Sequence, residues 1–164
     1  MLKKILLALL LIFVLIQFFR PAKNLSANEQ FDISTKYEMN ADVKDLLHTA
    51  CYNCHSNLTK YPLYYNIQPI TWWMANHVND AKKGLNFSEF VSRKISYQNK
   101  KFEDIIENVE EKEMPLPSYT WFGLHSEAKI TDQQRDLIIN WAAAQQDKLK
   151  AEYPADSLKM PPRK

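Results

Sequence analysis

The chain begins with an almost unbroken run of apolar residues. This run extends from Ile5 to Phe19, is interrupted only by Gln17, follows two lysines and is closed by Arg20-Pro21. A basic start followed by an apolar stretch is typical of an export signal. Fifteen residues rise roughly 22 Å as a helix, which is shorter than the ~30 Å hydrocarbon core of a bilayer. Residues 1–20 are therefore expected to form a signal anchor, a marginal transmembrane helix.

A cleaved export signal is the alternative to an anchor. Signal cleavage requires small residues in an Ala-x-Ala pattern, whereas the nearest candidate, Leu25-Ser26-Ala27, has a large residue at its first position. The sequence therefore favours an uncleaved anchor. The two lysines before the apolar run favour a cytoplasmic N-terminus. We expect a single anchor in the bacterial inner membrane with the rest of the chain in the periplasm, or a soluble periplasmic protein if the signal is cleaved.

After the anchor, residues 21–38 are polar and without periodicity, which predicts a linker. The helical periodicity that follows predicts a first helix with Asn40 as its N-cap and the Cys51–His55 segment at its C-terminal end. A second helix is expected to begin at Gln68-Pro69 and to end near Gly84. One face of this second helix is predicted to be apolar and contains Ile70, Trp73, Met74, His77 and Ala81.

The second half of the chain predicts two helices with clear periodicity and one short helix with a weak signal. Residues 88–97 are expected to form a short helix. A longer helix is predicted to end at Glu113, before the two prolines of Met114-Pro115-Leu116-Pro117. The last helix opens with Thr131 and Gln134 as a capping box. The predicted buried faces of the two helices with clear periodicity contain Phe102, Ile105, Ile106 and Val109, and Leu137, Ile138, Trp141 and Ala142.

These elements predict an all-α fold of four or five helices behind the hydrophobic anchor helix. Glycine is scarce, at two residues, and no segment alternates convincingly between apolar and polar, so no sheet is expected. The predicted domain spans residues 39–152, and residues 153–164 are expected to form a flexible tail. A chain segment of this length is enough for one domain with one core.

The charge balance excludes one class of partner. The chain has 21 basic and 19 acidic residues, but Lys3, Lys4 and Arg20 belong to the signal region. The remaining 18 basic residues against 19 acidic ones leave the rest near neutral, without a basic stripe that could follow phosphates. We expect no nucleic-acid binding.

Both cysteines of the chain lie in the pentapeptide Cys51-Tyr52-Asn53-Cys54-His55. This is the spacing of a c-type haem attachment site, in which two thiols add across the vinyl groups of one haem and the next histidine ligates the iron. The alternatives are a structural disulfide, a thioredoxin-like redox pair and half of a zinc site. A redox pair would need a βαβ setting, and zinc would need a second ligand pair, which the scattered His48, His77 and His125 do not provide. The motif therefore predicts one covalently attached haem c with His55 on its iron.

The second axial ligand of the iron would decide the chemistry of such a haem. Met114 is the preferred candidate, since it lies 59 residues after His55 at a helix end, in a segment that two prolines stiffen. A thioether ligand raises the reduction potential, which suits electron transfer. Met114 could instead fill a gap in the core. The rival ligand is His77, and His48 and His125 are expected to be surface residues or to lie near the haem without ligating it.

Beyond the pentapeptide, the chain resembles the haem-binding domain family of bacterial c-type cytochrome-like proteins over roughly residues 40–145. The resemblance implies a cytochrome c-like helical fold with one covalent haem and His55 as proximal ligand. It places His77, Met114 and His125 in the haem pocket without ranking them. The matching segments are Cys51–Asn57, Tyr61-Pro62, His77-Val78, Leu85–Ser88, Glu113–Tyr119, His125 with Ala128, and the helix that contains Trp141.

The function expected from these residues is that of a one-electron carrier between redox partner proteins, anchored to the membrane by its N-terminal helix, and not that of an enzyme. The alternative is a haem-based peroxidase or a gas or redox sensor with an open distal site, in which His77 or His125 acts as an acid or base. No distal His/Arg pair supports this alternative, because Arg93 and Arg135 fall in helical patterns that predict exposure. A haem with a structural or regulatory role is a third possibility.

Overall fold

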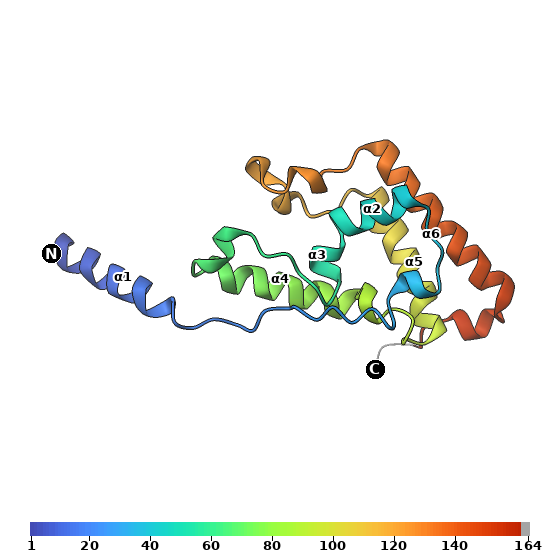
Figure 1. Ribbon diagram of the computed structural model, residues 1–164, viewed down its shortest axis with the longest axis horizontal. Coiled ribbons are helices and arrows are strands. Elements are labelled where there is room, and N and C mark those ends of the chain that lie inside the picture. Colours follow the sequence, from blue (N-terminus) through green and yellow to red (C-terminus); the bar gives the residue numbers. More distant parts are fainter. Residues whose placement is uncertain (162–164) are drawn as a thin grey trace.

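The computed structural model describes residues 1–161, and within this range all regular secondary structure is helical, apart from one isolated β-bridge between Leu25 and Leu58. The prediction of an all-α fold is therefore confirmed. The six α-helices are α1 (Leu2–Ile16), α2 (Ala41–Ala50), α3 (Tyr52–His55), α4 (Ile70–Gly84), α5 (Ile95–Glu110) and α6 (Asp132–Glu152) (Figure 1). The short 3-10 helices between and after them are η1 (Ile33–Thr35), η2 (Leu63–Asn66), η3 (Phe87–Glu89), η4 (Pro117–Tyr119), η5 (Trp121–Gly123), η6 (Ser126–Ala128) and η7 (Ala155–Leu158).

Helix α1 extends away from the other helices, as Figure 1 shows, and none of its residues is buried. It has 15 residues and therefore rises roughly 22 Å, against ~30 Å for the hydrocarbon core. Among residues 1–161, no helix is both long and apolar enough to cross a membrane. The prediction of a single N-terminal anchor in the inner membrane is therefore wrong.

The remaining helices pack around one core. Helix α5 packs along α6, and α2 lies against α6 (Figure 1). Phe102 of α5 is fully buried, and its ring makes edge-to-face contacts with Tyr37, Phe90 and Trp141. Such pairs stabilise a core beyond the area that they bury. The core thus joins the chain before α2 to the middle of α5 and α6.

The caps and periodicities account for most of these elements. Asn40 accepts a hydrogen bond from the Val43 amide, and Thr131 and Gln134 form both bonds of a capping box, as predicted. Leu137 was expected to be buried but is 39% exposed. The buried residues of α6 instead follow helical spacing from Ile138, so Leu137 lies beside that face.

The predicted short helix over residues 88–97 is wrong. Its first residues form η3, and the longer helix α5 already begins at Ile95. The connecting loop is held by Gln98, whose amide nitrogen donates to the Arg93 carbonyl at 2.6 Å. Helix α5 ends at Glu110 rather than at Glu113, because Lys112 adopts a left-handed conformation (φ 60°) that a helix cannot continue.

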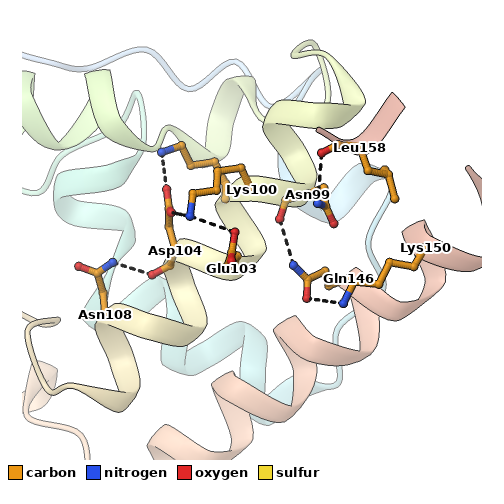
Figure 2. A network of polar contacts seen from close by, with 9 residues as sticks. Asn99, Lys100, Glu103, Asp104, Asn108, Gln146, Lys150 and Leu158 are labelled. Carbon is orange, nitrogen blue, oxygen red and sulfur yellow. Dashed lines mark hydrogen bonds and ion pairs between the residues drawn. The ribbon is translucent and has the colours of Figure 1, made fainter. Parts of the chain in front are cut away.

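The segments predicted as a linker and as a flexible tail both contact the helices. In the tail, Leu158 of η7 is 8% exposed, and its carbonyl accepts a bond from Asn99 of α5 at 3.4 Å (Figure 2). Residues 162–164 of the predicted tail lie outside the described residues. In the linker, residues 24–37, here called the N-terminal strap, run beside α3 and η3, and the Ser26 amide donates to the Asn57 carbonyl at 2.8 Å.

Candidate functional site

The Cys51–His55 segment forms a tight helical turn at the junction of α2 and α3. Cys51 ends α2 and begins α3, and its carbonyl accepts bonds from the amides of Cys54 at 3.1 Å and His55 at 2.9 Å. Both cysteines are free thiols. Because the turn is closed by its own backbone, the two thiols and the imidazole keep one fixed arrangement.

The N-terminal strap fastens this turn from outside. The Asn24 side-chain amide donates to the Ser56 carbonyl at 2.7 Å and to the Thr59 hydroxyl oxygen at 2.9 Å. Tyr52 donates its hydroxyl to the buried carboxylate of Asp32, 3.1 Å from both oxygens. Burial, together with the Asp32 charge, raises the pKa of Tyr52, so the phenol remains a donor at neutral pH. The Cys51–His55 turn, here called the attachment turn after the prediction from its sequence, is therefore held by residues 20 or more positions away.

The imidazole of His55 is held in its neutral form by its surroundings. Its Nδ1 lies 3.0 Å from the Leu85 carbonyl oxygen, which can only accept, so Nδ1 carries the proton and Nε2 keeps a free lone pair. Burial lowers the pKa of His55 and favours this neutral form, while the carbonyl bonds oppose the shift. A histidine fixed through Nδ1 by a backbone carbonyl is the usual arrangement of a metal-ligating imidazole.

The two thiols are held in their protonated form. Burial raises the pKa of Cys51 to about 12, with a further contribution from Cys54, and burial also raises the pKa of Cys54. Reactive redox cysteines have the opposite property, a lowered pKa. Among residues 1–161, no group of three or more His, Cys, Asp and Glu side chains could hold a metal ion. The pair is therefore better suited to the chemistry of a neutral thiol than to that of a thiolate.

A large cavity opens in front of the attachment turn and consists of two adjoining hollows, an inner one of about 550 Å³ and an outer one of about 560 Å³. The inner hollow reaches α5 and α6, and Cys51 lines it. The outer hollow reaches the loop after Met114, and Cys54 lines it. The residues that line both hollows are Ala50, His55, Trp73, His77, Ala81, Met114, Pro115 and Leu116.

Helix α4 forms one wall of this cavity. All five residues of its predicted apolar face line the outer hollow, although Trp73 is 49% exposed. The buried side chains of α4 are those of Thr71, Met74, Ala75 and Val78, and two of them, Met74 and Val78, also line the outer hollow. The apolar face that the sequence predicted for this helix is therefore largely a cavity wall.

Met114 faces the cavity from an irregular loop after α5. Its amide donates to the Asn108 carbonyl at 3.0 Å. Its own carbonyl accepts from Nη1 of Arg135 at 2.7 Å, and the same nitrogen donates to the Val109 carbonyl at 3.1 Å. Arg135 was expected to be exposed, but it is half-buried against this loop. Only the packing of α6 against α5 reveals its contact with Met114.

His77 reaches the same cavity from α4. Its Nδ1 lies 2.9 Å from the Trp73 carbonyl oxygen, and its ring lies 4.3 Å from the Trp73 ring. This contact leaves Nε2 available, as in His55, but His77 is exposed whereas Met114 is half-buried. The structure thus brings His55, Met114 and His77 together around one cavity.

His125 lies behind the cavity wall. Its Nε2 is 2.6 Å from the Tyr64 hydroxyl, and its ring stacks on Tyr119 at 4.2 Å. Tyr64 and Tyr119 line the outer hollow, and Asn53, which lies between the two cysteines, donates to the Tyr119 hydroxyl at 3.0 Å. Periodicity gave no signal for these tyrosines because they lie in 3-10 turns. His48 stacks on Tyr52 at 4.0 Å and is exposed.

Comparison with known proteins identifies the family. The family model described as haem-binding domain matches residues 11–144 of the 164-residue chain. No curated protein and no solved structure gives a significant match. The match covers more than half of the chain and includes the attachment turn, α4 and Met114. The chain belongs to the haem-binding domain family.

Proposed function

We propose that this haem-binding protein holds one haem covalently through Cys51 and Cys54 and acts as a one-electron carrier. His55 and Met114 are the proposed axial ligands of the iron. The observation that carries the proposal is that two protonated thiols, an imidazole with a free Nε2 and a thioether side chain all belong to one cavity. We further propose that residues 39–152 form a cytochrome c-like domain.

The residues present fit a haem. The two hollows, of about 550 and 560 Å³, are within the usual size of ligand sites, roughly 300–1,000 Å³. Their walls are mainly apolar, as the face of a porphyrin requires. Thioether bonds form from thiols, and burial keeps both cysteines in that form. The donor set, with imidazole and thioether sulfur, is one that haem iron accepts.

When bound, the haem would supply an iron that gains and loses one electron. The chain would do the rest: Leu85 orients the imidazole of His55, and the backbone bonds of Met114 keep its side chain at the cavity. Met114 as ligand would raise the reduction potential, whereas the alternative ligand His77 would lower it relative to Met114. Apolar walls would exclude water from the iron and tune the same potential.

Redox partner proteins are proposed to approach at the outer hollow. Two aromatic side chains of its lining are strongly exposed there, Trp121 at 58% and Phe122 at 97%. Exposed aromatic residues are enriched where proteins meet. An electron could pass between partners at this rim because a second protein can reach these two exposed side chains.

One observation favours a second function, a haem peroxidase or sensor. The Tyr64 hydroxyl lines the outer hollow and is hydrogen-bonded to His125, whose Nδ1 lies 3.3 Å from a Glu127 oxygen. Such a series of groups can carry a proton to or from a bound small molecule. This function requires an iron whose distal position opens readily.

The test uses the haem-loaded protein. Acid–acetone treatment should leave the haem bound to wild-type protein, and the oxidised protein should show the weak sulfur-to-iron charge-transfer band of His/Met ligation. Met114→Ala should abolish this band and lower the midpoint potential, whereas His77→Ala should leave both unchanged. A band that survives in Met114→Ala contradicts Met114 as ligand. A high-spin spectrum with prompt CO binding in the wild type would favour the peroxidase or sensor.

A further inference from the structure

We propose that Arg135 is a positioning residue that holds Met114 at its place on the cavity. This inference rests on the proposed function, since it assigns to Arg135 the task of keeping the thioether ligand on the iron. Its basis is the pair of hydrogen bonds from Nη1 of Arg135 to the carbonyl oxygens of Met114 and Val109, at 2.7 and 3.1 Å.

The loop that carries Met114 has few other bonds. Pro115 and Pro117 have no N–H group, so they cannot donate. The Met114 amide donates to the Asn108 carbonyl at 3.0 Å, and the next bond along the loop joins the Tyr119 amide to the Leu116 carbonyl at 2.9 Å. The backbone of Met114 is therefore held at two points, one by α5 and one by Arg135.

Both acceptors suit a cation. Val109 lies in the last turn of α5, where the helix dipole is negative, and its carbonyl also accepts a long bond from the Lys112 amide at 3.3 Å. A guanidinium satisfies the Val109 carbonyl and the Met114 carbonyl at once, and charge-assisted bonds are the stronger kind. Among residues 1–161, no ion pair involves Arg135, so its guanidinium is not shared with a carboxylate.

Both supports of the loop are themselves fixed. The Arg135 amide donates to Thr131 at 2.9 Å in the capped first turn of α6, which packs along α5. On the other side, the Asn108 side chain donates to the Asp104 carbonyl at 2.6 Å, and Asp104 is paired with Lys100 at 3.1 Å (Figure 2). The backbone of Met114 is thus hydrogen-bonded to both packed helices, to α5 through Asn108 and to α6 through Arg135.

The loop also contains a contact that serves as a matched control. Lys112 and Asp132 form an ion pair at 2.7 Å between the same loop and the same helix, but their side chains are 61% and 74% exposed. Exposed pairs contribute little, and this one does not touch Met114. Asp132→Asn therefore removes a charge between the same two elements without loosening Met114.

The experiment measures how firmly Met114 holds its position in the oxidised, haem-loaded protein. Imidazole competes for the distal site, so its apparent affinity reports the fraction of protein in which Met114 has left. Arg135→Gln should bind imidazole at least about tenfold more tightly than wild type and should weaken the sulfur-to-iron band. Arg135→Lys keeps the charge, so its imidazole affinity should lie between those of wild type and Arg135→Gln. The affinity of Asp132→Asn should match that of wild type.

Each outcome decides the matter. If Met114→Ala abolishes the band but Arg135→Gln and Arg135→Lys bind imidazole as wild type does, the positioning role is overturned and Met114 remains the ligand. If Met114→Ala changes nothing, Met114 is not the ligand, and both the assignment and the positioning role are overturned. If Arg135→Gln does not fold, Arg135→Lys alone decides: wild-type imidazole affinity and band overturn the role, whereas tighter imidazole binding with a weaker band supports it.

Discussion

The two walls of the cavity are built differently. The attachment side consists of Cys51–Thr59 with the N-terminal strap, and its contacts come from several directions, including Asn24, Asp32 and Leu85. The ligand side consists of residues 111–128, an irregular segment that contains three non-glycine residues with left-handed φ, Lys112, Phe122 and His125. On this side, the main polar connections to the rest of the protein are the bonds of Met114 to Arg135 and Asn108, the Asn53–Tyr119 bond and the Tyr64–His125 bond.

On the proposed function, the attachment side retains the haem, and the ligand side sets the reduction potential of its iron. A turn fixed by many independent bonds loses little when one of them is removed. A loop held by few bonds responds to each of them, and left-handed conformations add local strain to it. We therefore expect changes on the attachment side to affect haem retention and stability, and changes on the ligand side to affect ligation and potential.

The largest effect is expected from the thiols. Replacing both Cys51 and Cys54 by Ser should release essentially all the haem into the organic phase on acid–acetone extraction, because no thioether bond can form. Met114→Ala, on the other wall, should retain its haem as the wild type does. If Met114→Ala releases the haem as well, or if the double variant retains it, retention does not depend on the attachment side alone.

Asp32→Ala tests the strap. The variant leaves the buried hydroxyl of Tyr52 and the Ser34 amide without their acceptor, so it should lower the free energy of unfolding by about 2 to 3 kcal/mol. Urea unfolding followed by circular dichroism measures this change. The exposed Asp136→Ala is the control and should lie within about 0.5 kcal/mol of wild type. A change in the sulfur-to-iron band of Asp32→Ala would show that the two walls are coupled.

Thr131→Ala should have a smaller effect on stability but a visible one on ligation. It removes half of the capping box at the start of α6, so we expect a loss of about 1 kcal/mol. Because Arg135 projects from this turn, imidazole affinity should rise in the same direction as in Arg135→Gln, but less. Gln134→Ala, which removes the other half, is the matched variant. If the imidazole affinity is unchanged in both variants, loosening the first turn of α6 does not affect the position of Met114.

The smallest effect is expected at high pH. Burial raises the pKa of Tyr119 from 10.0 to about 12. A folded-state pKa above the unfolded one means that the unfolded chain loses this proton first, so the contribution to stability is present below pH 10 and is lost as pH rises toward 12. Tyr119→Phe should therefore lose less free energy of unfolding than wild type across this range. If the free energy of unfolding falls with pH equally steeply in both proteins, Tyr119 makes no such contribution.

Local patterns were enough to predict much of the fold. The caps at Asn40 and Thr131 follow from interactions within a few residues and are confirmed. On the predicted face of α5, Phe102, Ile105 and Val109 are buried as expected, whereas Ile106 is half-buried. Boundaries failed where a contact from outside the element decides them, as in the loop that Gln98 holds before α5. The apolar face of α4 was recognised from its spacing, but spacing does not distinguish a core face from a cavity wall.

Sequence patterns were enough to predict the all-helical fold, the Cys51–His55 motif and the candidates His55, Met114 and His77, because helical period and motif spacing act over short distances. Tertiary structure alone decided that these side chains share one cavity, that a strap beginning at Asn24 fastens the attachment turn and that Arg135 holds Met114. These contacts join residues far apart in the chain, and only the packing of α5 against α6 and of the strap against α3 brings them within hydrogen-bonding distance.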